Sequence, residues 1–199
     1  MNYADILYAK KLAGGGGSAP VLIEKDIIEN GTYTAADDDA DGYSSVTVNC
    51  PEPGDYNCIV GFTDESQKRI SDVRGGVKQI VLPDDTIAIG TNFLFSNKFI
   101  TSITIPTQLI DISESAFSGC SNLSEVIFSA NSRCIYISKD AFKGCTSLTQ
   151  ITIPSSITSI HYSVFSGCSA LEKIIINKPE GSISRAPWGA PNAEVIWTG

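Results

Sequence analysis

Three aspartates at alternating positions are the first residues in the chain that suggest chemistry. Asp37, Asp39 and Asp41 precede Gly42, which matches the opening D-x-D-x-D-G of a calcium-binding loop. Carboxylates in this order can surround a hard cation such as Ca²⁺. The bidentate glutamate expected at the twelfth position is replaced by Val48, and the flanking residues predict strands. The same string suits a hairpin turn, so a weak Ca²⁺ site and a turn stay open, with the turn favoured.

The six cysteines are a repeated set of three, a pair, and Cys134, which takes the place held by Leu109 and Ile157 and is therefore expected in the core. Cys120, Cys145 and Cys168 occupy one repeated position, at spacings of 25 and 23 residues. Stacked thiols raise the question of zinc or a disulfide, but C-x-x-C pairs are missing, and unpaired cysteines are mostly buried. We therefore expect these three thiols to be structural and expect no metal there. Cys50 and Cys58 flank a turn sequence, where a disulfide stays open in an oxidising compartment.

A nucleophilic site is not expected. His161, the one histidine, follows an apolar residue predicted to face inward, so it should point to solvent. Cys168 lies seven residues on but is predicted to be buried, which argues against a Cys–His pair. Sequence motifs typical of hydrolases, phosphate-binding loops and dinucleotide folds are missing as well. We expect no enzymatic activity and no cofactor.

Composition excludes further classes of function. The 199 residues include 14 basic and 22 acidic side chains, a net charge of −8, whereas nucleic-acid binding requires clustered Lys and Arg. No apolar stretch approaches the ~20 residues of a membrane span. The lysines at 10 and 11 follow the apolar residues of the N-terminus, which is the wrong order for a signal peptide.

The elements that must position these residues come from an internal repeat. An apolar frame begins at residues 77, 100, 123, 148 and 171, at spacings of 23, 23, 25 and 23. Apolar residues at positions 1, 4 and 6 of each copy predict a short strand, which a proline often ends. Since one coil cannot bury its own apolar edge, neighbours must stack. We predict a mainly β fold in which residues 77–199 form a leucine-rich-repeat-like solenoid with a parallel sheet.

The closing segment of each copy supplies the core. Glycines recur just before the repeated cysteines, where the chain needs a positive φ. Asn97 stands at the cysteine position of the first copy. The structural residues expected at the aromatic position of successive copies are Phe117, Phe142, Phe165 and Trp188.

The recurring frame ITIPxxIxxIxxxxFxGCxxL, for example from Ile151 to Leu171, resembles the BspA-type, or Treponema-type, leucine-rich repeats. Gln108 and Ser156 stand where ordinary leucine-rich repeats place Asn or Cys, so the usual asparagine ladder is missing. The resemblance implies a surface-exposed protein that binds other proteins, including matrix proteins of a host. It implies an extracellular or cell-surface location, to which the resemblance of the front segment described below adds a virion location.

The front of the chain differs in charge and pattern. Residues 1–76 hold 13 acidic and 6 basic side chains. We expect a short helical segment and Gly-rich tether over 1–18, and a small acidic β region and connector over 19–76. Strands at 21–23 and 45–48 are expected to form a hairpin. Residues 28–48 resemble a segment of prophage tail-associated proteins of Gram-positive bacteria, and the closing residues 186–199 resemble the end segment found there.

What remains for function is the exposed face of the repeat sheet. β-branched residues on such a face also simply favour strands, so their presence alone does not indicate that the face binds a ligand. Two hypotheses follow. In the first, the chain is a module that binds a protein or glycan through this face, and residues 1–76 attach it to a larger assembly or form a homo-oligomer. In the second, the solenoid is a structural spacer or cap, and residues 1–76 make the functional contact. The candidate face comprises Gln79, Val81, Ser102, Thr104, Glu125, Ile127, Gln150, Thr152, Lys173 and Ile175.

Overall fold

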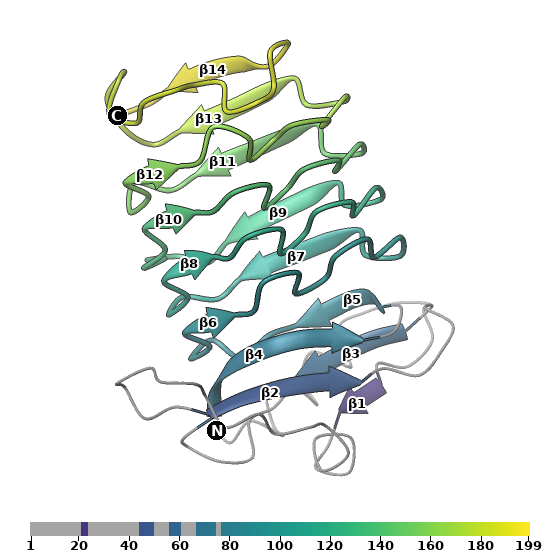
Figure 1. Ribbon diagram of the computed structural model, residues 1–199. Helices are drawn as coiled ribbons and strands as arrows, with labels where there is room; N and C mark the ends of the chain where they lie inside the picture. Colours follow the sequence, from purple (N-terminus) through teal and green to yellow (C-terminus); the bar gives the residue numbers. More distant parts are fainter. Residues whose placement is uncertain (1–20, 24–43, 50–55, 61–66, 75–76) are drawn as a thin grey trace.

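The computed structural model describes residues 21–23, 44–49, 56–60, 67–74 and 77–199, with side chains from residue 80 onward. The described residues form strands joined by turns, which stack as successive coils along one axis (Figure 1). The strands are β1 (Val21–Ile23), β2 (Ser44–Asn49), β3 (Tyr56–Val60), β4 (Gln67–Arg74), β5 (Val77–Val81), β6 (Ala88–Ile89), β7 (Ser102–Ile105), β8 (Asp111–Ile112), β9 (Glu125–Phe128), β10 (Tyr136–Ile137), β11 (Gln150–Ile153), β12 (Ser159–Ile160), β13 (Lys173–Ile176) and β14 (Glu194–Trp197).

Each coil contributes one strand to each of two sides of the solenoid. One side carries the sheets β1-β3-β5-β7-β9 and β11-β13-β14, and the other carries β2-β4-β6 and β8-β10-β12. All of these pairs are parallel, and Ile103, for example, lies opposite Val126 of the next coil. The solenoid and its parallel sheet are therefore confirmed.

The hairpin expected in the front region is wrong. Residues 21–23 and 44–49 are strands, but they belong to different sheets. β1 pairs with β3 and β2 pairs with β4, both in parallel. The physical reason is that a strand of one coil meets its backbone partner one turn further along the chain, as β5 does with β7 and β11 with β13. The expected helix over 1–18, the acidic string Asp37, Asp39 and Asp41, and Cys50 lie outside the described residues.

An aromatic column runs through the core. Phe117 stacks on Phe142 with ring centroids 5.3 Å apart and planes 6° apart, and Phe142 stacks on Phe165 at 6.0 Å and 12°. Phe93 meets Phe117 edge to face at 6.0 Å. Trp188 is fully buried in the next coil, where its carbonyl accepts the N–H of Phe165 at 2.9 Å. Aromatic contacts of this kind add to the gain from burial.

A column of thiols runs beside the aromatic column. The Sγ of Cys120 donates to the carbonyl of Leu94 at 3.1 Å, and Cys145 does the same to Phe117 at 3.3 Å. Each thiol therefore ties its coil to the preceding one. Burial raises the pKa of Cys120 to about 12, although the backbone of Asn97 and the charge of Lys98 oppose the shift. These cysteines are free.

Candidate binding face and groove

The residues of the candidate face lie along one side of the stack. Thr104, Ile127 and Thr152 are exposed on consecutive coils, whereas Val81 and Ile175 are half-buried. Ile127 has 43% of its surface exposed, an unusual value for an isoleucine on a strand. The other row holds exposed Glu125, Gln150 and Lys173 and half-buried Ser102, and the side chain of Gln79 lies outside the described residues.

This side of the stack is split between β9 and β11. Within the described residues, the backbone ladder that joins β7 to β9 stops at β9 and begins again between β11 and β13. The other side is continuous at this level, because β10 pairs with both β8 and β12, and its own interruption lies between β6 and β8. The same two coils remain bonded there, since the N–H of Thr158 donates to the carbonyl of Ile135 at 2.8 Å. The split is therefore open along one side only.

A longer loop explains the split. Three residues lie between Ile105 and Leu109, but five lie between Phe128 and Cys134, and this accounts for the 25-residue spacing of that copy. The loop is hydrogen-bonded to the preceding coil, because the N–H of Arg133 donates to the carbonyl of Thr107 at 2.9 Å. In the described structure no backbone hydrogen bond joins residues 129–133 to residues 154–157 of the coil that follows.

The strand register identifies which backbone groups face the split. Successive residues of a parallel strand direct their N–H and C=O groups alternately to the two neighbouring strands. The N–H of Glu125 donates backward to Thr101 at 3.2 Å, and that of Asn177 donates from the following coil to Ile153 at 3.1 Å. The groups that face the split therefore belong to the alternate residues, Val126 and Phe128 on β9 and Gln150 and Thr152 on β11.

A groove of about 780 Å³ lies along the split. Its walls come from β9, β11, the long loop and the turn after β11, and Ile127, Asn131, Gln150 and Thr152 are among its exposed residues. Ser156 also lines it, and the Ser156 hydroxyl is buried without a hydrogen-bond partner in the described structure. Buried polar groups in native proteins nearly always have a partner, so the Ser156 hydroxyl is an exception at the wall of the groove.

The groove is almost uncharged. Glu125 alone among its lining residues carries a charge. The nearest basic residue of the loop, Arg133, is engaged elsewhere, because its Nη1 lies 2.8 Å from the Oε1 of Gln108 in the preceding coil. The lining therefore offers mainly hydroxyl, amide and backbone groups.

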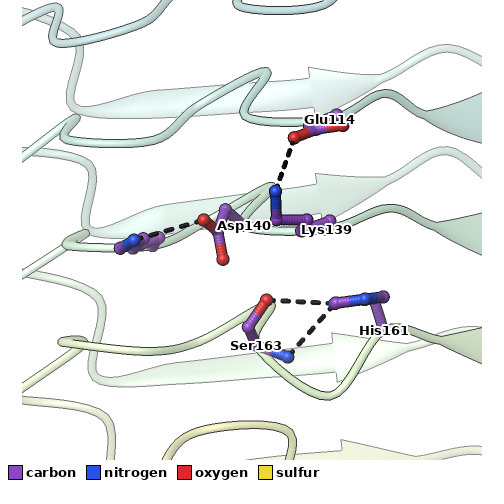
Figure 2. Close-up of polar contacts among 6 residues, drawn as sticks. Glu114, Lys139, Asp140, His161 and Ser163 are labelled. Atoms are coloured by element: carbon purple, nitrogen blue, oxygen red, sulfur yellow. Dashed lines mark hydrogen bonds and ion pairs between the residues drawn. The ribbon is translucent and has the colours of Figure 1, made fainter.

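A second polar cluster lies on the turns (Figure 2). Lys139 pairs with Glu114 at 3.1 Å and Lys143 with Asp140 at 3.2 Å, while the Nδ1 of His161 lies 3.0 Å from the Oγ of Ser163. Partial burial raises the pKa of Asp140, but hydrogen bonds from Ser163 and Lys143 outweigh it, so the net pKa lies below its usual value.

This second cluster does not have the order of a nucleophilic relay. In such a relay the histidine lies between the carboxylate and the hydroxyl, whereas here Ser163 contacts both Asp140 and His161. Cys168 is buried and donates to the carbonyl of Phe142 at 3.0 Å, so it does not partner His161. The cluster ties adjacent turns together by polar contacts.

The described residues lack two features that would point to other functions. They contain no group of three or more His, Cys, Asp or Glu side chains arranged to hold a metal ion. Nor do they contain a helix long and apolar enough to cross a bilayer.

The sequence pattern predicted which side of the strands is exposed but did not predict the groove. The signal was present, because one repeat is two residues longer than the others and the extra residues follow its strand. The polar contact between His161 and Ser163 was also missed, since it depends on how the turn folds back on itself.

Comparison with known proteins places the repeat in a family. Residues 75–186 match the model of the BspA type leucine rich repeat region. A leucine rich cell surface protein from Faecalibacterium prausnitzii has a similar solved structure, with a TM-score of 0.57 and 27% identity over 75% of this chain. This chain spans 41% of that protein. A T. pallidum leucine rich repeat protein matches at a TM-score of 0.49 and 16% identity, over 87% of this chain and 63% of its own. No curated protein matches the sequence.

Proposed function

The chain belongs to the BspA-type leucine-rich repeat family, and from this premise we propose that it is a non-enzymatic binding module. Its repeat sheet engages a protein or glycan at a bacterial or phage surface. A leucine rich cell surface protein among its structural relatives supports the surface location. The described residues offer a face and a groove, with no cluster ordered for nucleophilic catalysis.

The observation that carries the proposal is the exposed pair Ile127 and Thr152 at the split. A regular sheet would bury the backbone edges of these strands against each other, whereas here both strands line an open groove. Exposed apolar side chains beside unpaired polar groups are typical of a surface that meets a ligand. Five strands ~4.8 Å apart and ~17 Å long offer a face on the order of 400 Å², which is less than the ~800 Å² per partner of a standard protein interface. We therefore propose that avidity adds to the affinity, with residues 1–76 as the attachment or oligomer-forming part.

The test places charge on the face without disturbing the core. The full chain with Ile127→Lys and Thr152→Lys is labelled, and its retention on intact bacterial cells and on immobilised matrix proteins is compared with that of the unchanged chain. We expect retention to fall at least tenfold while Tm changes by about 2 °C or less, because both residues are exposed.

The matched control changes the same residue types in the same two coils on the other side. Ile135 and Thr158 are both exposed there, so Ile135→Lys with Thr158→Lys adds equal charge away from the face. We expect this control to bind as the unchanged chain does. Equal loss in both variants, or full retention by the first, would overturn the proposal.

A further inference from the structure

The split between β9 and β11 gives one part of the face a distinct chemistry. We propose that the groove along this split binds an uncharged oligosaccharide. The inference rests on the proposed function, because Ile127 and Thr152 belong to both the face and the groove. It adds the chemical class of the ligand and its location.

Backbone groups supply the first part of the recognition. The N–H and C=O groups that face the split have no partner in a strand ladder within the described structure, so they must bond to water or to a ligand. They present donors and acceptors in alternation along both walls. A sugar hydroxyl donates and accepts at the same oxygen, and so it matches such an alternation better than a group with only one role.

Side chains supply the second part. Asn131 in the long loop and Gln150 on β11 are exposed amides of the lining, and Ile127 on β9 adds an exposed apolar surface. Amides bond to neighbouring hydroxyls, while an aliphatic side chain packs against the C–H surface of a sugar ring. Ser156 adds a hydroxyl that lacks a partner within the described structure. This combination of a few polar groups with an apolar contact is usual in small-ligand sites.

Charge argues against an anionic ligand. Glu125 is the one charged residue of the lining, and Arg133 is held by Gln108 of the preceding coil. An acidic sugar or a phosphate would meet a like charge with no cation of the lining to offset it. The site therefore favours an uncharged saccharide over a charged one.

Space argues against an inserted peptide strand. An added strand needs ~4.8 Å on each side, which would separate β9 from β11 by about twice the usual spacing. The two coils are held close on either side of the split, by the bond from Thr158 to Ile135 at 2.8 Å and by that from Gly144 to Ser166 at 2.8 Å. A volume of about 780 Å³ is within the range of ~300–1,000 Å³ for small-ligand pockets.

The test closes the groove by restoring the common repeat length. Deleting Ala130 and Asn131, both exposed, returns the copy to 23 residues and should let β9 pair with β11. The probes are maltotetraose, cellotetraose and chitotetraose as neutral sugars and trigalacturonate as an anionic one, added to the full chain at millimolar concentration. Binding is measured by titration calorimetry and by amide shifts in NMR spectra.

We expect at least one neutral probe to bind, to shift amides of residues 125–131 and 150–156, and to lose at least tenfold in affinity in the deletion variant. A second variant, Asn131→Gly with Gln150→Ala, removes both amides while keeping the positive φ of 58° at residue 131. It should weaken binding similarly with little change in Tm. Binding of trigalacturonate alone, or of no neutral probe, would overturn the inference.

The same variants separate this inference from the proposed function. If Ile127→Lys with Thr152→Lys abolishes retention on cells while the deletion variant is retained fully, the face binds but the groove is not the sugar site. In that case the inference fails and the proposed function stands. If the unchanged chain binds a neutral probe through residues elsewhere, the inference is likewise overturned.

Discussion

The guanidinium of Arg133 lies 2.8 Å from the amide oxygen of Gln108, one coil earlier in the stack. Together with the bond from its backbone N–H to Thr107 at 2.9 Å, this contact anchors the long loop to the coil before it. The following coil loses its partner on this side, and a groove opens between β9 and β11. Two additional residues in one repeat thus convert part of a regular sheet into a candidate site.

Hydrogen exchange should reveal the split directly. The amides of Gln150 and Thr152 face β9 without a ladder, whereas those of Ile151 and Ile153 face the paired strand β13. We expect the first pair to exchange about fivefold faster or more, since a net hydrogen bond contributes about 1 kcal/mol. The measurement is exchange followed by NMR on the full chain. Equal protection of the four amides would contradict an open split.

Removing the central ring of the aromatic column should destabilise the solenoid strongly. Phe142 is fully buried and stacked between Phe117 and Phe165. We expect Phe142→Ala to lower the free energy of unfolding by about 3–5 kcal/mol, as is typical of buried phenylalanines. Urea denaturation measures the loss. Tyr162→Ala is the control, because Tyr162 is 57% exposed and its removal should cost about 0.5 kcal/mol or less.

The buried thiols should make stability fall at alkaline pH. Burial raises the pKa of Cys134 from 9.0 to about 12, with the backbone of Tyr136 opposing the shift. Between these values the unfolded chain releases the thiol proton and the folded chain keeps it, so the unfolded state gains stability as pH rises. The thiol contributes about 1.4 kcal/mol per pH unit to this loss.

The control for this pH dependence is Cys134→Val, since Leu109 and Ile157 hold the equivalent position in neighbouring coils. Denaturation of both proteins at pH 8 and pH 10.5 compares the two slopes. We expect the unchanged chain to lose more stability than the variant over this range. Identical losses would show that Cys134 ionises as readily in the folded chain as in the unfolded one.

The repeat could be predicted from the sequence because burial imposes its period. Ile103, Val126 and Ile151 are buried at equivalent places, and Gly119 and Gly144 take φ values of +75° and +71° just before the cysteines. The pairing of β1 and β2 could not be predicted, since local patterns do not show that a strand's partner lies one coil away. The groove was missed because it depends on which neighbour the extra loop bonds to.

The most direct test of the account maps where the ligand touches the full chain. A photo-crosslinking side chain is placed at Thr152 on the face, at Thr158 on the other side of the same coil, or at Tyr33 in the front region. Each protein is bound to intact bacterial cells and irradiated, and adducts are detected by mass. We expect adducts from position 152 and none from position 158. Adducts confined to position 33 would instead assign the contact to the front of the chain and contradict the account.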